Sequence, residues 1–143
     1  MADDAPPSTR MLPVLDDHNR AFWTGGADGR LKVPFCARCG VWVSPLAAEC
    51  PDCDGVLESR PVTGRGTVFT YTVNHQPFNP VVPVPYVIAI VELEEQADLR
   101  IASNIVDCEP DSVYVGLPVE VRFERQDIGA ENVYMPVFAP RVD

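Results

Sequence analysis

Four cysteines in two closely spaced pairs constrain this chain more than any other feature of its sequence. Cys36 and Cys39 form one Cys-x2-Cys pair, and Cys50 and Cys53 form a second pair after ten intervening residues. Two residues between cysteines let one turn present both sulfurs to the same ion, so two such turns can complete a tetrahedral site. The spacing predicts a structural zinc ion held by Cys36, Cys39, Cys50 and Cys53.

Free thiols and redox pairs of the thioredoxin type are the alternatives for these cysteines. A redox pair is expected to open a helix in a βαβ unit, and neither pair has that setting. A segment of about 30 residues cannot bury enough apolar surface to fold alone, so metal binding is expected to supply much of its stability. Four thiolates leave no open position for water, and we expect no metal-ion catalysis.

Glycines near the cysteines fit the tight turns that such a site requires. Gly40 follows Cys39 directly, and Gly55 lies two residues after Cys53. Both are expected to adopt the positive φ that a turn around a metal often needs.

Short strands dominate the remaining sequence. A short helix is expected over residues 13–23, with Pro13 in its first turn and Gly25-Gly26 as its stop. Strand composition and alternation recur at residues 31–35, 41–43, 67–73, 86–93, 99–106, 117–125 and 132–138. The last five strands fall within about 75 residues and leave no room for crossover helices, which favours a small antiparallel barrel.

The predicted fold class is therefore mainly β, with an N-terminal helix, a rubredoxin-like zinc ribbon and a five-stranded OB-fold barrel. We expect residues 1–30 to form an N-terminal arm and helix, residues 31–59 the zinc ribbon, and residues 60–143 the barrel with a C-terminal tail.

The charge of the chain argues against nucleic acid as a ligand, although zinc ribbons and OB-folds can both bind it. The 143 residues include 21 Asp and Glu against 11 Lys and Arg, for a formal net charge of -10. Neutralising phosphates requires a clustered basic face, and the basic residues here are scattered along the chain. No stretch resembles a membrane span or a signal peptide, so we expect a cytoplasmic protein.

Candidate residues for catalysis are few. His18 and His75 are the only two histidines, which makes a catalytic triad hard to build. His75 could touch a ligand beside the proline-rich loop, but a surface role is more common for such a residue. Cys108 is expected to be a small buried apolar residue rather than a nucleophile. We assign no catalytic residue to this chain.

A stiff apolar loop, residues 76–86, joins the first two expected barrel strands. It contains four prolines together with Phe78 and Tyr86. OB-folds contact ligands or partners through the loop at this position, and exposed apolar loops often mark interaction surfaces. A rigid cap over the barrel end is the alternative. We take Phe78 and Tyr86 as candidate ligand contacts.

The order of these parts resembles a known family. The matching motifs are Phe22-Trp23, Gly29-Arg30-Leu31, Cys36-Ala37-Arg38-Cys39-Gly40, Cys50-Pro51-Asp52-Cys53, Gly66-Thr67-Val68, Pro85-Tyr86-Val87 and Val119-Glu120-Val121. Together they resemble the acyl-CoA-associated family, known as domain of unknown function 35, that joins an N-terminal helix, a zinc ribbon and an OB-fold. The resemblance covers residues 13–140. The sequence departs from it at residues 96–98, where the family often has a glycine.

What the resemblance implies is an accessory subunit. Members commonly associate with thiolase-like enzymes or with lipid-transfer-protein-like aldolases that act on CoA thioesters, including an aldolase of actinobacterial steroid side-chain degradation. We therefore expect a non-catalytic partner of such an aldolase in a hetero-oligomer. Acyl-CoA would lie at or near the interface, with Arg65 or Arg100 meeting the CoA phosphates.

The resemblance also indicates where the partner would dock: the helix around Phe22 and Trp23, the ribbon, and the loop from Phe78 to Tyr86. Three alternatives stay open at this point. The chain could be a nucleic-acid-binding module, an accessory subunit of a biosynthetic acyl-CoA thiolase or synthase, or an enzyme in its own right that uses Cys108 or His75.

Overall fold

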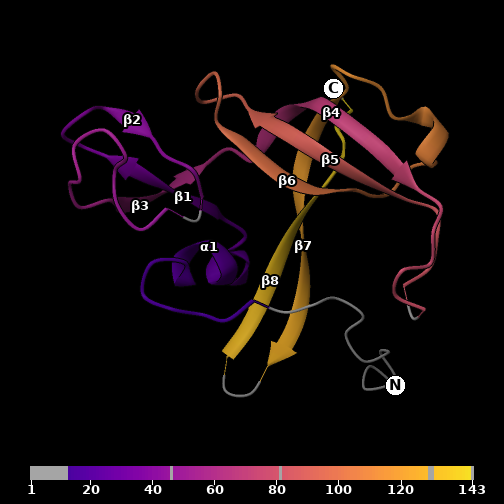
Figure 1. Cartoon of the computed structure of the whole chain (residues 1–143), viewed down its shortest axis with the longest axis horizontal. Coiled ribbons are helices and arrows are strands. Elements are labelled where there is room, and N and C mark those ends of the chain that lie inside the picture. Colours follow the sequence, from indigo (N-terminus) through magenta and orange to yellow (C-terminus); the bar gives the residue numbers. More distant parts are fainter. Residues whose placement is uncertain (1–12, 46, 81, 129–130, 143) are drawn as a thin grey trace.

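A computed structural model describes residues 13–45, 47–80, 82–128 and 131–142. A ribbon with a three-stranded sheet and a short helix lie to one side of a five-stranded barrel (Figure 1). The elements are α1 (Arg20–Thr24), η2 (Gly25–Asp28), β1 (Leu31–Cys36), β2 (Val41–Trp42), β3 (Glu58–Val62), β4 (Arg65–Asn74), β5 (Tyr86–Leu93), β6 (Arg100–Ile105), η3 (Pro110–Ser112), β7 (Pro118–Ile128) and β8 (Glu131–Pro140). None of the helices in the described ranges has the length and apolar character needed to cross a membrane.

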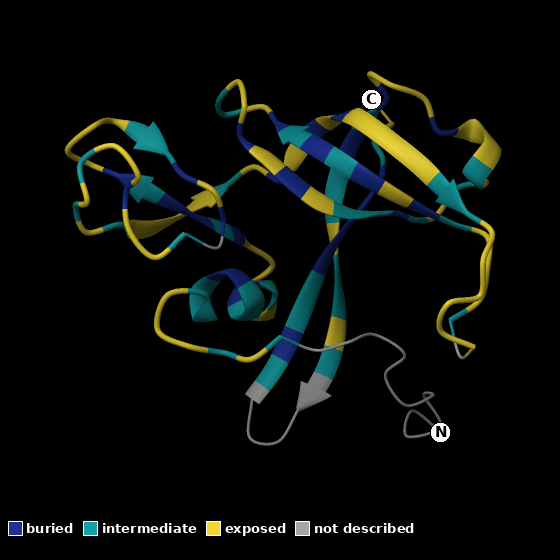
Figure 2. Cartoon of the chain, viewed as in Figure 1, coloured by how far each residue is buried: buried dark blue, intermediate teal, exposed yellow. Residues whose placement is uncertain are grey.

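The barrel closes in the strand order β4-β5-β6-β8-β7. All of its neighbouring strands pair antiparallel except β6 and β8, which run parallel at Ile105 and Phe138. This is the five-stranded Greek-key arrangement of the OB-fold, and it confirms the predicted mainly β class. Strand β5 spans the predicted residues 86–93, and its alternate residues Val87, Ala89, Val91 and Leu93 face the barrel interior (Figure 2).

The ribbon sheet has the order β2-β1-β3. Strand β3 was not predicted, because its residues Glu-Ser-Arg-Pro-Val are almost all exposed and show no apolar alternation. It pairs along β1 from Leu31 with Val62 to Phe35 with Glu58. The strand therefore crosses the expected segment boundary between residues 59 and 60.

The predicted helix was too long at its N-terminal end. The Asp16 carboxylate accepts hydrogen bonds from the backbone N–H groups of His18 and Asn19, at 2.8 and 2.9 Å, and the Asn19 side chain accepts one from the Asp16 N–H at 2.8 Å. Such local side-chain bonds offer the backbone an alternative to a helix. As a result α1 begins only at Arg20.

The α-helix ends where it was expected to, since Gly25 is its C-cap, and the chain then continues as the 3-10 helix η2 up to Gly29, whose φ is 69°. A Cβ atom on Gly26 would collide with the side chains of Phe123 and Tyr134, and one on Gly25 with the carbonyl oxygen of Arg30. Gly26 thus permits close packing of the helical segment against the β7–β8 hairpin, and Gly25 permits the close approach of the chain at Arg30.

Two hydrophobic cores of unequal size hold the fold together. The large one joins Phe22 of α1 and Leu31 and Val33 of β1 to the barrel interior. The small one has only three buried members, Cys36, Val43 and Cys50. The far end of the ribbon therefore has very little apolar burial of its own.

Gln96 fastens the ribbon to the barrel at the turn between β5 and β6. Its amide oxygen accepts a hydrogen bond from the Trp42 backbone N–H at 2.9 Å, and its amide nitrogen donates to the Trp42 carbonyl oxygen at 3.0 Å. The side chain thus pairs with β2 much as a neighbouring strand would. This is the turn at which the sequence departs from the family pattern.

We predict that Gln96→Ala lowers the free energy of unfolding by about 1–3 kcal/mol, because two partly buried backbone groups of Trp42 lose their partners. Urea unfolding followed by tryptophan fluorescence measures this change. Gln76→Ala, which removes an exposed loop glutamine, is the matched control and is expected to leave stability unchanged. Equal stability of both variants would contradict the role given to Gln96.

Candidate functional site

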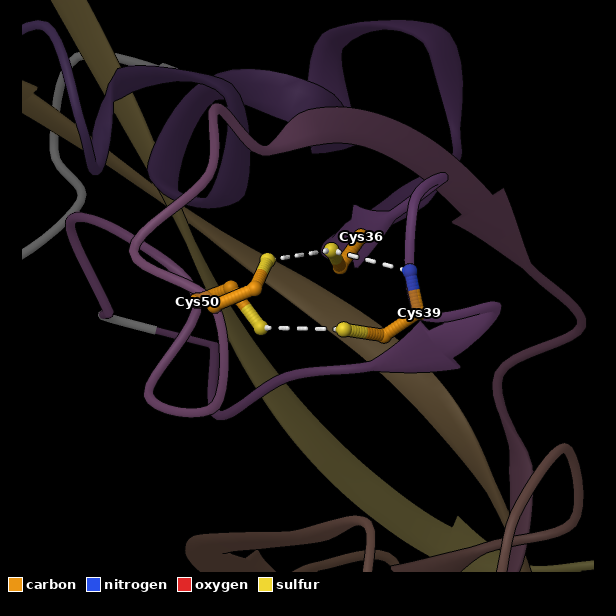
Figure 3. Close-up of side chains that lie close together, drawn as sticks. Cys36, Cys39 and Cys50 are labelled. Atoms are coloured by element: carbon orange, nitrogen blue, oxygen red, sulfur yellow. Dashed lines mark hydrogen bonds between the residues drawn. The ribbon is translucent and has the colours of Figure 1, made fainter.

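The four cysteines of the ribbon converge in the structure. Cys36 ends β1, Cys39 lies in the turn before β2, and Cys50 and Cys53 lie in the loop that leads to β3. All four Sγ atoms lie within 4.8 Å of one another, as expected for residues that could hold a metal ion. Figure 3 shows Cys36, Cys39 and Cys50 pointing toward a common centre.

The two cysteine pairs share one backbone geometry. The N–H of Gly40 donates to the Cys36 carbonyl at 2.7 Å, and the N–H of Asp54 donates to the Cys50 carbonyl at 2.9 Å. Both donors have a positive φ, 69° for Gly40 and 57° for Asp54. The expectation for Gly40 is confirmed, whereas in the second turn Asp54 takes the position expected of Gly55. Aspartate is one of the few residues that tolerate this conformation.

The Sγ distances match a single four-coordinate centre. Cys36 lies 3.6 Å from Cys53, and Cys50 lies 3.9 Å from Cys39, so each close contact joins one turn to the other. Cys36 and Cys50 are fully buried, Cys53 is half-buried and Cys39 is exposed. Burial of sulfur without disulfides fits thiolates that are held for a metal ion.

The thiols of the first pair differ in acidity. A hydrogen bond from the Cys39 backbone N–H to the Cys36 Sγ, at 3.4 Å, lowers the pKa of Cys36 to about 7. Hydrogen bonding to the thiols of Cys53 and Cys36 raises the pKa of Cys39 to about 12. The backbone hydrogen bond therefore favours the thiolate form at Cys36 over that at Cys39.

The four candidate ligand contacts do not form one compact site. Arg65 and Arg100 begin β4 and β6 at the ribbon end of the barrel, whereas Tyr86 begins β5 at the other end and Phe78 lies in the loop before it. Arg100 pairs with Glu92, which lies six residues after Tyr86 on the same strand. Six residues of extended strand span about 20 Å. Only an elongated ligand could contact both groups.

The two arginines differ in their surroundings. Arg100 contacts the carboxylates of Glu92 at 3.3 Å and Asp98 at 3.1 Å, and its guanidinium lies 3.7 Å from the centre of the Phe69 ring. Its charge is therefore already compensated. Arg65 is exposed and stands opposite Glu120 on β7.

Phe78 is 81% exposed, so the loop does not cap the barrel with this ring. Tyr86 is half-buried at the start of β5. Cys108 is partly buried against the large core, as expected of a small apolar residue, and His75 is exposed.

A groove that sequence reasoning missed lies where helix, ribbon and barrel meet. It has a volume of about 290 Å³ and is lined by Phe22, Trp23, Ser44, Pro45, residues 100–104 and residues 135–137. Four segments far apart in the sequence build it, so no local pattern could reveal it. The aromatic pair Phe22-Trp23 at the end of the helix, which the sequence predicts to pack against the protein or a partner, was the available signal.

Comparison with known proteins agrees with this architecture. The family model for the C-terminal OB-fold domain of ChsH2 matches residues 59–124. In solved structures, the chain called Ltp2-ChsH2(DUF35) aldolase is similar with a TM-score of 0.76 and 34% identity, over 92% of this chain and 100% of that one. The chain belongs to the DUF35 family.

Curated relatives carry two kinds of name. A DUF35 domain-containing scaffold protein of Methanothermobacter thermautotrophicus is 42% identical over 63% of this chain and 68% of its own length. A probable enoyl-CoA hydratase alpha subunit of Thermomonospora curvata is 33% identical over 98% of this chain. The 3-oxo-4,17-pregnadiene-20-carboxyl-CoA hydratase alpha subunit of Mycobacterium tuberculosis is 32% identical over 85%. This chain spans 43% and 38% of the two hydratase subunits.

We predict that Cys36→Ser loses its bound metal more readily than Cys39→Ser. Cys36 is fully buried in the small core of the ribbon and its Sγ accepts the Cys39 backbone N–H, whereas Cys39 is exposed, so a serine at position 36 disturbs the cluster more than one at position 39. Elemental analysis after dialysis at pH 7.5 gives the metal content of each variant. Equal metal content in the two variants, or a greater loss from Cys39→Ser, would argue against this order.

Proposed function

We propose that the chain is a non-catalytic accessory subunit that binds and supports a thiolase-fold, lipid-transfer-protein-like aldolase acting on acyl-CoA. The reaction would be retro-aldol cleavage in steroid side-chain degradation. The observation that carries this proposal is the similarity over the full length of the ChsH2 DUF35 chain of an aldolase complex, at 34% identity. A relative named for a steroid-derived CoA thioester supports the substrate class.

The side chains of this protein support a partner role rather than a catalytic one. Within the described residues, no histidine is hydrogen-bonded to Cys108, and His75 lies exposed in a loop. A nucleophile needs a base within hydrogen-bond reach, and a four-cysteine centre has no open coordination position. The catalytic groups would therefore belong to the thiolase-fold subunit.

Zinc is the metal we propose for the cysteine centre. Zn–S bonds of about 2.3 Å in a tetrahedron place neighbouring sulfurs about 3.8 Å apart, and the two close pairs lie at 3.6 and 3.9 Å. Bound zinc would supply the ribbon with the stability that its core of three buried residues lacks. Cys36, Cys39, Cys50 and Cys53 would be its ligands.

Acyl-CoA would lie at or near the subunit interface. Of the two arginines proposed for its phosphates, Arg65 is the better candidate, because Arg100 is engaged with Glu92 and Asp98. Phe78 and Tyr86 would contact the ligand only if it extended along the barrel, about 20 Å from the arginines.

An accessory role toward a biosynthetic thiolase or synthase is the second candidate. It is favoured by the methanogen relative, which is named a scaffold protein and is more similar in sequence than the hydratase subunits. The thioester that the reconstituted complex consumes distinguishes the two candidates. Cleavage of a steroid hydroxyacyl-CoA supports the first, and condensation of short acyl-CoA supports the second.

We predict that the isolated chain does not cleave a steroid-derived hydroxyacyl-CoA, and that adding the thiolase-like subunit produces cleavage, because only the partner brings catalytic groups. Cleavage is measured by chromatography, which detects the released ketone and the shortened acyl-CoA. A chain with all four cysteines changed to serine is the control and is expected to give little activity with the partner. Robust turnover by the isolated chain would refute the proposal.

We also predict that Arg65→Ala in the complex raises KM for the acyl-CoA about threefold to tenfold with little change in kcat, as expected for the loss of one exposed charge contact to phosphate. The matching acyl-pantetheine, which lacks the nucleotide phosphates, tests whether Arg65 contacts those phosphates. Its KM should be the same for the complex with Arg65 and the complex with Arg65→Ala. An equal KM effect on both substrates would remove Arg65 from the phosphate site.

A further inference from the structure

One outward-facing side of the barrel carries exposed apolar residues among small polar ones. Strands β4, β5 and β6 place two rows of residues side by side on it: Thr70, Ile90 and Ala102 in one row, and Thr72, Ile88 and Asn104 in the next. We call these six residues together with Phe69 the outer sheet face. Ile88 is 41% exposed and Phe69 is 45% exposed. OB-folds bind their ligands through this side of the barrel.

An irregularity in β4 turns Phe69 outward. The register between β4 and β5 shifts between Val68 and Thr70, so Phe69 is an extra residue in its strand. Val68 before it is buried in the barrel interior. A β-bulge of this kind re-aims side chains and is treated as a specific feature of a fold. It adds an aromatic ring to a side of the sheet that would otherwise carry small and branched residues.

The outer sheet face continues into the groove beside the ribbon. Ala102 and Asn104 belong to the face and also line the groove, whose opposite wall consists of Trp23, Ser44 and Pro45. A convex apolar sheet and a hollow of about 290 Å³ therefore form one surface. Such hollows receive the anchor side chains that dominate binding in many protein interfaces.

The charges around this surface select its occupant. Arg100 at its edge is balanced by Glu92 and Asp98, so the three groups together carry one negative charge. The Phe69 ring, which could stack on a base, is covered by the Arg100 guanidinium. At this face nucleic acid would therefore meet an arginine that two carboxylates already balance and a ring with that arginine over one side. A second copy of the chain would meet a like net charge, since each copy carries -10.

We propose that the outer sheet face and the adjoining groove form the surface that docks the thiolase-like subunit. The partner presents an apolar anchor side chain to the groove and places basic residues opposite Glu92 and Asp98. This inference rests on the proposed function and assigns the partner a specific face, with the bulged Phe69 and the isoleucines of β5 at its centre.

Binding of the Ltp2 subunit of the similar aldolase complex, measured by isothermal titration calorimetry, tests the inference. Ile88→Arg places a cation on the face, and Ala102→Phe fills the groove without changing charge. Both residues point away from the barrel core, so the fold is expected to persist, and far-UV circular dichroism and the urea midpoint verify this. Val115→Arg, at a residue that is 64% exposed in the loop before β7, is the matched control.

The expected result is that each face variant weakens binding at least about tenfold, as is typical of central interface residues, while Val115→Arg binds like the unaltered chain. Binding of the unaltered chain should also weaken as salt increases, because the rim charges are complementary.

Two outcomes would overturn the inference alone: the unaltered chain binds and both face variants bind equally well, or the chain by itself forms a dimer in light scattering that Ile88→Arg dissociates. If the unaltered chain does not bind at all, the proposed function fails, and this inference fails with it.

Discussion

The scarcity of apolar burial at the far end of the ribbon is the constraint on which the rest of the structure depends. Within the described residues, the small core there consists of Cys36, Val43 and Cys50, and two of these three residues, one from each cysteine pair, belong to the cysteine cluster. A core of that size cannot offset the conformational entropy lost by ordering two loops. Two of the candidate ligand residues are therefore also core residues, and binding of the proposed metal and folding of the ribbon would become one event.

A second layer of constraint fixes the ribbon relative to the barrel. Phe22 and Leu31 enter the same core as the barrel strands, and the Gln96 side chain pairs with the backbone of Trp42. Apolar burial supplies most of the free energy, whereas the two directional hydrogen bonds select one orientation. The groove between Trp23 and Ala102 exists only because this orientation is fixed.

The sequence allowed prediction of those features that depend on local chemistry. The spacing of the cysteines predicted their convergence, and the apolar alternation from Tyr86 to Leu93 predicted β5 to the residue. Features that depend on distant partners were missed. Strand β3 is formed by pairing with β1 and has no apolar pattern, and the close approach of Gly26 to Phe123 and Tyr134 depends on the distant β7–β8 hairpin. The helix start failed for a local reason, a competing side-chain turn at Asp16.

The same barrel side that serves nucleic-acid binding elsewhere is built here for different chemistry. Binding a single strand requires exposed rings and unpaired cations along the face. In this chain the bulge at Phe69 exposes a ring, but Arg100 covers it, and Glu92 and Asp98 neutralise that arginine. What remains is a neutral to acidic apolar surface with isoleucines at its centre. Burying such a surface against the apolar side chains of another protein is favourable because water is removed from both. A phosphate backbone binds through cations, which this surface does not offer in unpaired form. On the proposal made here, a few side chains would suit an OB-fold to docking a protein, while its barrel core stays unchanged.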